Sequence, residues 1–199
     1  TSRLVGSEMC IRDSNISVQI GNYVAVQDTF LKDNETYLMN HYVLDYNREL
    51  ASNFFPQSKE VIRFYEKYFG DYQWYEDGYK IIEVPYLGME HQSAVTYGNG
   101  FSIYNGVRSK SWPMYGVIDP LIIHETGHEW FGNSVTASDP THIWIHEGLQ
   151  VYSESIFFED KFKSYEVGVH YLNSIKNRIV NEIPTVSYTH LRAHETTCD

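Results

Sequence analysis

The feature that most restricts the fold of this 199-residue chain is a pair of histidines in the sequence His-Glu-Thr-Gly-His at residues 124–128. Residues four apart lie on one face of an α-helix, so His124 and His128 can present two imidazoles to one ion if this segment is helical. An apolar run before the pair and Gly132 after it predict a helix over residues 120–131. Neutral imidazole nitrogen is a preferred zinc ligand, so the pair indicates a zinc site. The alternative is a pair of histidines packed in the core without a metal.

A catalytic zinc site needs three protein ligands and one open position. Glu147, with 18 residues between it and His128, is the candidate for the third ligand. We expect it in the first turn of a helix over residues 143–160, which a connection of this length can place beside the first helix. His142 and His146 flank the start of that helix, and either is an alternative third ligand.

Three further acidic residues have distinct expected roles. Glu125 follows the first histidine by one position, so it is placed to contact a water on the metal rather than the metal itself. Glu154 lies two helical turns after Glu147 on the same face and can accept a hydrogen bond from a ligand histidine, although a solvated surface position is an equal alternative. Glu129 is expected to point away from the metal, as a capping or surface residue.

The charge composition excludes some classes of partner. The chain has 15 basic and 26 acidic residues and a net charge of −11, which argues against a nucleic-acid surface or an anionic membrane surface. No apolar run reaches the roughly 18–20 residues that a membrane span needs. The composition therefore indicates a soluble globular segment, and both a cytoplasmic and an extracytoplasmic location remain open.

Both ends of the chain differ from the body. Residues 1–14 and 187–199 contain strings, SEMCIRDS and SYTHLRAHET, that resemble translations of sequencing-adaptor DNA. We therefore predict that both ends are non-native and that the natural product extends further in both directions; two disordered tails are the alternative. Cys10 and Cys198 lie in these ends, so the body offers no disulfide and no thiolate ligand.

The pattern of the body predicts an α+β fold. Residues 15–46 alternate like a β-hairpin with a turn at 32–34, and residues 47–68 are helical with an interruption at Pro56 and an end at Gly70. Short strands are expected at 80–85, 94–97 and 101–104, and a last helix at 164–180.

Taken together, the motifs resemble those of the M1 family of zinc aminopeptidases, the gluzincins. The resemblance rests on Gly88-Met89-Glu90, on the two histidines with Glu147, and on the strings Trp-Phe-Gly-Asn at 130–133 and Trp144-x-x-Glu147-Gly148. It implies that residues 15–46 are the end of a β-saddle domain. It also implies that residues 47–186 are part of a thermolysin-like catalytic domain.

The resemblance also implies roles. One Zn²⁺ would be bound by His124, His128 and Glu147, and Glu125 would act as general base on a zinc-bound water. The substrate would be a peptide with a free N-terminus, which Glu90 would pair with, and the other partners would be the remaining domains of a longer chain. The rest of the substrate motif is Gly88, where the substrate backbone would approach closely, and Met89.

Two departures from the family pattern matter. His91 stands where the family more often has Asn, and no tyrosine matches the oxyanion-stabilising tyrosine found about 60 residues after the third ligand. We therefore expect residues 15–186 to bind zinc with weak or no peptidase activity. The alternatives are a non-catalytic zinc-containing peptide-binding module, a zinc endopeptidase and an epoxide hydrolase.

Overall fold

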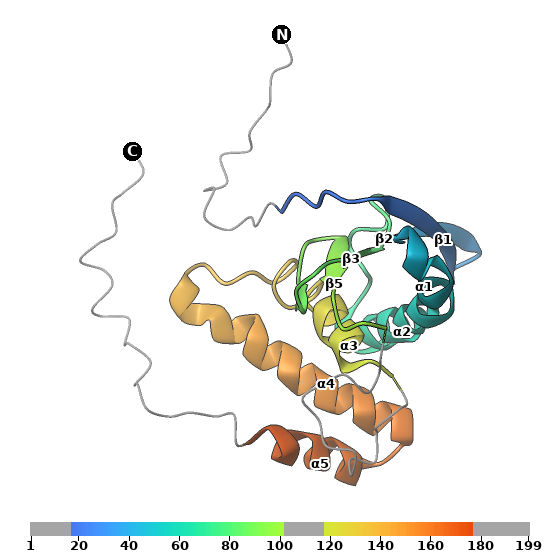
Figure 1. Cartoon of the computed structure of the whole chain (residues 1–199). Helices are drawn as coiled ribbons and strands as arrows, with labels where there is room; N and C mark the ends of the chain where they lie inside the picture. The colour runs from blue at the N-terminus through green and yellow to red at the C-terminus, as the bar shows by residue number, and fades with distance from the viewer. Residues whose placement is uncertain (1–16, 102–117, 177–199) are drawn as a thin grey trace.

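A five-stranded sheet forms one part of the molecule, and helices pack against it (Figure 1). The computed structural model describes residues 17–101 and 118–176. In these residues the strand order is β1-β2-β3-β5-β4, with β2, β3 and β5 parallel to one another and β1 and β4 antiparallel to their neighbours. The strands are β1 (Tyr23–Lys32), β2 (Glu35–Leu44), β3 (Lys80–Glu83), β4 (Gly88–Met89) and β5 (Ala94–Tyr97).

The predicted hairpin is confirmed. Strands β1 and β2 pair over their full length, from Tyr23 opposite Leu44 to Lys32 opposite Glu35. The two turn residues, Asp33 and Asn34, have φ of 51° and 65°. Asp and Asn tolerate this left-handed conformation better than most residues, and two such residues in a row match the twist of the hairpin. The same sheet continues into β3, and the domain boundary near residue 46 stays a prediction.

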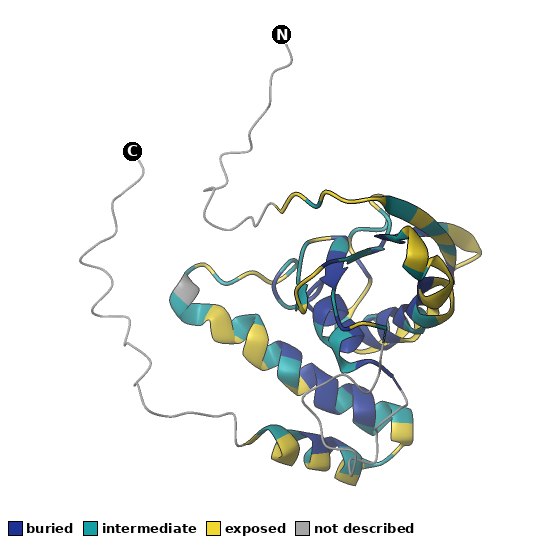
Figure 2. Ribbon diagram, viewed as in Figure 1, coloured by how far each residue is buried: buried dark blue, intermediate teal, exposed yellow. Residues whose placement is uncertain are grey.

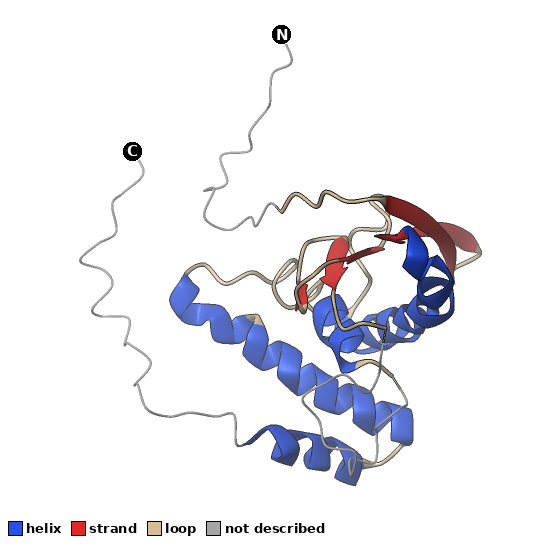
Figure 3. Ribbon diagram, viewed as in Figure 1, coloured by secondary structure: helices blue, strands red, loops and turns tan. Residues whose placement is uncertain are grey.

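Five helices complete the described fold, and α3 lies between α2 and α4 (Figures 1 and 3). A short 3-10 turn at Phe55–Gln57 separates α1 from α2, which places the predicted interruption at Pro56. Gly70, with φ of 95°, ends α2 as expected. The helices are α1 (Arg48–Phe54), α2 (Ser58–Phe69), α3 (Pro120–Gly127), α4 (Glu147–Phe162) and α5 (Tyr165–Ile175).

Two predicted helix boundaries are wrong. Helix α3 ends at Gly127 rather than at residue 131, because the chain then turns and its amides bond five residues back, as Asn133 N–H does to the His128 carbonyl. His128 keeps helical dihedrals (φ −61°, ψ −17°), so the spacing of the two histidines is unaffected. Helix α4 begins at Glu147 rather than at 143, because Asp139 caps a 3-10 segment, Pro140–Ile145, that precedes it.

Other predictions lie partly outside the described residues. These are the strand at 101–104 and the last helix, whose described part is α5. The strand predicted at 80–85 is observed as β3, and it ends two residues earlier than predicted. The α+β class is confirmed.

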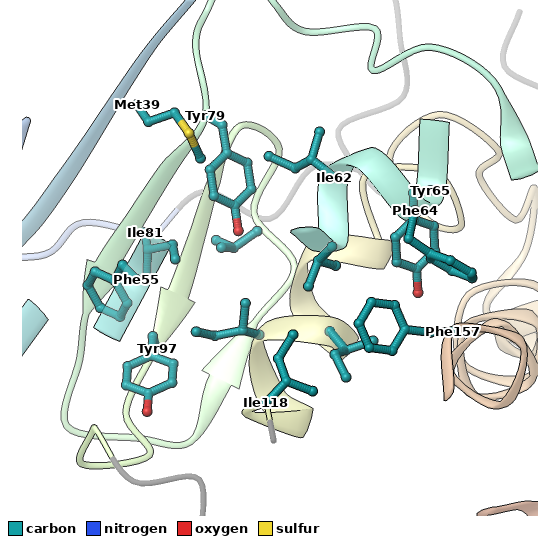
Figure 4. Packing of buried hydrophobic residues seen from close by; sticks show 14 of the residues in the cluster. Met39, Phe55, Ile62, Phe64, Tyr65, Tyr79, Ile81, Tyr97, Ile118 and Phe157 are labelled. Atoms are coloured by element: carbon teal, nitrogen blue, oxygen red, sulfur yellow. The ribbon is translucent and has the colours of Figure 1, made fainter. Parts of the chain in front are cut away.

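Buried aromatic side chains join the sheet to the helices. Figure 4 shows Phe64 and Tyr65 of α2 beside Phe157 of α4, and the rings of Phe64 and Phe157 meet edge to face at 5.0 Å. On the sheet side, the Tyr79 hydroxyl lies 2.6 Å from Thr126 Oγ1 of α3. Helix α4 is exposed at its first turn and buried further along (Figure 2). Among the described helices, none is both long and apolar enough to cross a membrane.

Candidate metal centre

The start of α3 is fixed by a buried carboxylate. Asp119 accepts a hydrogen bond from the Leu121 N–H at 2.8 Å, as a helix-capping residue does, and Pro120 occupies the first helical position. The Tyr97 hydroxyl of β5 donates to the same carboxylate at 2.7 Å, and Asn99 donates as well. Burial raises the pKa of Asp119, against the effect of these hydrogen bonds. The sheet therefore determines where α3 begins.

The three predicted ligands lie together. His124 Nε2 and His128 Nε2 are 3.2 Å apart, so both imidazoles turn to one point as their spacing predicts. Glu147 reaches the same point from the first turn of α4, with its carboxylate oxygens 3.4 Å from His124 Nε2 and 3.8 Å from His128 Nε2. The side chain of Glu147 is 49% exposed, which leaves one side of this group open.

Each histidine is held through its other ring nitrogen. His124 Nδ1 lies 2.7 Å from Glu154 Oε1, and His128 Nδ1 lies 2.8 Å from the Phe131 carbonyl oxygen. Both partners are acceptors, so each Nδ1 donates its proton and Nε2 is the ring nitrogen that faces the shared point. Glu154 is only 2% exposed, on the face of α4 that its spacing from Glu147 predicts.

The charges of this group fit a divalent cation. Burial lowers the pKa of His124, but the hydrogen bonds with Glu147 and Glu154 outweigh it and raise that pKa to about 11. In the metal-free chain a proton on His124 thus balances the carboxylates, and a cation bound by the two Nε2 atoms would supply that positive charge in its place. Two imidazoles and one carboxylate are also the ligand set of many catalytic zinc sites. The residues present therefore fit zinc.

Glu125 and Glu90 form a second group of possible ligands with His128. The carboxylate oxygens of Glu90 and Glu125 and a ring nitrogen of His128 all fall within 4.8 Å of one another. Burial raises the pKa of Glu125 to about 8; His124 opposes this and the charge of Glu90 adds to it. Gly88 of β4 leaves room for this carboxylate, because a side chain there would come within 2.5 Å of Glu125 Oε1.

The segment after α3 holds the Glu90 loop in place. Glu129 accepts a hydrogen bond from the Ser93 N–H at 2.6 Å, and Asn133 Nδ2 donates to the Glu90 carbonyl at 3.1 Å. Glu129 is 2% exposed, so the expectation of a surface or capping position is wrong. Its partner is 36 positions away in sequence, and helical periodicity gives no sign of such a contact.

The alternative third ligands are placed differently. His146 Nε2 accepts a hydrogen bond from the Ala137 N–H at 2.9 Å, which uses the lone pair a metal would need. Neither His146 nor His142 joins a metal-capable group in the described part of the chain, whereas Glu147 does.

The chain is similar to a known family of proteins. The Peptidase family M1 domain matches residues 54–191, more than half of the chain, so this chain belongs to the peptidase M1 family. It is 29% identical over 123 residues to human endoplasmic reticulum aminopeptidase 2, covering 58% of this chain and 12% of that protein. It is 26% identical over 148 residues to leucyl aminopeptidase of Saccharolobus solfataricus, covering 69% of this chain and 18% of that protein.

Solved structures show the same fold. An M1 zinc metallopeptidase from Deinococcus radiodurans aligns with a TM-score of 0.57 and 18% identity, covering 80% of this chain and 33% of that one. A two-domain M1 zinc metallopeptidase bound to L-tryptophan aligns with the same TM-score, over 79% of this chain and 33% of that one. The chain thus spans less than a fifth of the two curated relatives named above and about a third of these two structures.

Proposed function

We propose that this chain is the metal-binding part of a zinc-dependent aminopeptidase, a hydrolase that removes N-terminal residues from peptides. The observation that carries the proposal is the convergence of the Nε2 atoms of His124 and His128 with the Glu147 carboxylate. Membership of the M1 family and the likeness to aminopeptidases support it. Under this proposal the three residues bind one Zn²⁺.

Zinc, when bound, supplies a Lewis acid that polarises a carbonyl and lowers the pKa of a water. Glu125 is the proton carrier of the proposed reaction. Its pKa of about 8 in the metal-free chain places the carboxylate near the point where it can both accept a proton and return it to a leaving amine. Its buried position beside Gly88 keeps bulk water from competing for that proton.

Glu90 is the proposed anchor for the substrate N-terminus. Its carboxylate lies beside Glu125 and His128, so a peptide ammonium paired with it would place the first peptide bond next to the metal group. Asn133 holds the main chain of Glu90, which limits where the anchor can move. An endopeptidase needs no such anchor, so Glu90 favours an exopeptidase.

The first test is zinc per chain after dialysis against metal-free buffer. We expect a value near one for the unmodified chain and for Glu125→Gln, because Glu125 is not a ligand. A value near zero in a folded sample would overturn the proposed metal centre.

The second test separates an aminopeptidase from an endopeptidase or a binding module. Peptides with a free and with an acetylated N-terminus are compared, using Glu125→Gln as the inactive control. We expect any turnover above that control to require the free N-terminus, and cleavage of the acetylated peptide would contradict the anchor role of Glu90. The expectation of weak activity for residues 15–186 stays a prediction, and full zinc-dependent turnover would contradict it.

A further inference from the structure

A fully buried polar network lies behind the metal group. It consists of Tyr65 of α2 and of Gln150 and Ser153 of α4, each with an exposure of 0%. We call it the Tyr65–Gln150–Ser153 network. Buried polar groups are costly unless they are hydrogen-bonded, so the way these three satisfy one another decides the local packing.

The hydrogen bonds of the network have fixed directions. Gln150 Nε2 donates to the Tyr65 hydroxyl at 2.7 Å, and the Ser153 hydroxyl donates to the main-chain carbonyl of Gln150 at 2.6 Å. An amide nitrogen only donates and a carbonyl only accepts. The remaining contact, 2.7 Å between the Tyr65 hydroxyl and Ser153 Oγ, is therefore donated by Tyr65.

The network joins the two helices that carry the ligands. Gln150 Nε2 also lies 3.2 Å from the Ile123 carbonyl of α3, the residue immediately before His124. On α4, Gln150 follows Glu147 by three residues, and Ser153 immediately precedes Glu154. Each contact of the network is thus within one helical turn of a group that faces the metal site.

Gly127, the residue before His128, leaves the space that the network fills. A side chain at Gly127 would place its Cβ 2.1 Å from the Tyr65 hydroxyl and 2.2 Å from Gln150 Oε1. These separations are far below van der Waals contact, so α3 can approach the network this closely only with glycine at this position.

We propose that Tyr65, Gln150 and Gly127 are positioning residues for the metal centre. They set the distance between α3 and α4 at which His124, His128 and Glu147 can share one zinc ion. None of the three is itself a ligand, so they act through the helices that carry the ligands. This inference rests on the proposed function, because it concerns the same zinc site.

The test compares the zinc affinity of two tyrosine variants of the full chain, measured by competition with a chelator. Tyr65→Phe removes one hydroxyl from the network and keeps the ring, which stacks on Trp130 at 4.9 Å. Tyr68→Phe is the matched control, because its hydroxyl bonds to Asp160 on the surface. We expect Tyr65→Phe to bind zinc about tenfold more weakly, as residues that orient ligands do, and Tyr68→Phe to be unchanged.

Cobalt in place of zinc gives a second readout, because its visible spectrum reports the geometry of the ligands. We expect a changed spectrum in Tyr65→Phe and the unmodified spectrum in Tyr68→Phe. Ser153→Ala breaks the same network from α4, and it serves if Tyr65→Phe does not fold. The double variant of both residues should lose less affinity than the sum of the two single losses, because both changes remove the contact between Tyr65 and Ser153.

The outcomes separate this inference from the proposed function. If the unmodified chain binds no zinc, the metal centre and this inference fall together. If the unmodified chain, Tyr65→Phe and Ser153→Ala bind zinc equally well, only the positioning role is overturned. A lower free energy of unfolding in the metal-free variants, with unchanged zinc affinity and cobalt spectrum, likewise overturns it and leaves the network a purely structural part.

Discussion

Two buried histidines, one in the sheet and one at the end of α3, differ in what faces their Nδ1 atom. In β2, His41 Nδ1 accepts a hydrogen bond from the Ile81 N–H at 3.1 Å, so the ring proton lies on Nε2. At the end of α3, His128 Nδ1 faces the Phe131 carbonyl at 2.8 Å, so the proton lies on Nδ1 and the Nε2 lone pair is available. Both side chains are 1% exposed. Burial alone therefore does not distinguish a core histidine from a ligand; the partner of Nδ1 does.

The charge around His41 differs from that around His124, the other histidine of the metal group. Burial lowers the pKa of His41 to about 4, and no hydrogen-bond partner for its Nε2 is found within residues 17–101 and 118–176. His124 is also largely enclosed, yet the hydrogen bonds with two carboxylates bring its pKa to about 11. The sheet histidine is thus kept neutral, whereas His124 favours positive charge; burial and the charge of His124 lower the pKa of His128.

The largest predicted effect removes a ligand histidine. We expect His124→Ala to weaken zinc binding by more than about 100-fold, because loss of a ligand should exceed the effect of losing a residue that only orients one. His41→Asn is the control, since its amide oxygen can replace Nδ1 as the acceptor for Ile81. Competition with a chelator measures both, and an equal loss in the two variants would erase the distinction between them.

Acid should destabilise the fold through His41. The pKa of this side chain is about 4 in the folded chain, against an ordinary value of 6.5, so the unfolded chain binds this proton first as the pH falls. Stability is therefore lost between about pH 6.5 and about pH 4, by about 3 kcal/mol from this group. Denaturant unfolding of metal-free protein across this range should show a smaller loss in His41→Asn. Parallel curves for the two proteins would contradict the assignment.

Removal of the charge behind His124 should have a smaller effect. Glu154→Gln keeps an acceptor for His124 Nδ1 but loses the negative charge, so we expect about tenfold weaker zinc binding. Glu166→Gln, an exposed change in the first turn of α5, is the control. Equal zinc affinities in the two variants would show that Glu154 only fills space.

Local patterns in the sequence predict that the proposed ligands can meet at one point, but they do not predict the surroundings of these residues. The spacing of His124 and His128, and that of Glu147 and Glu154, follow helical periodicity. This periodicity depends only on neighbours within one or two turns. The burial of Glu129 depends on Ser93, and the position of Gln150 depends on Tyr65, 85 residues away. Such contacts are set by tertiary packing, which no local pattern encodes.

The errors in helix boundaries have the same cause. The pattern of apolar residues continues past Gly127 and begins before Glu147, so periodicity alone extends both helices. Hydrogen bonds from the turn after Gly127 and the Asp139 cap at 3-10 segment Pro140–Ile145 end that regularity in the folded chain. Helix ends are determined by capping and tertiary contacts more than by hydrophobic spacing.

The smallest predicted effect concerns His146, a third histidine beside the site. Its Nε2 accepts the Ala137 N–H, so its remaining nitrogen carries the proton and neither is available to a metal. His146→Gln keeps an acceptor within reach of Ala137 and should change zinc affinity by less than about threefold, the range of substitutions outside a critical contact. Glu147→Ala, measured beside it, should weaken binding far more. A larger loss of zinc affinity in His146→Gln than in Glu147→Ala would make His146 the third ligand. His146 would then be a ligand like His124 and His128, and not a core histidine like His41.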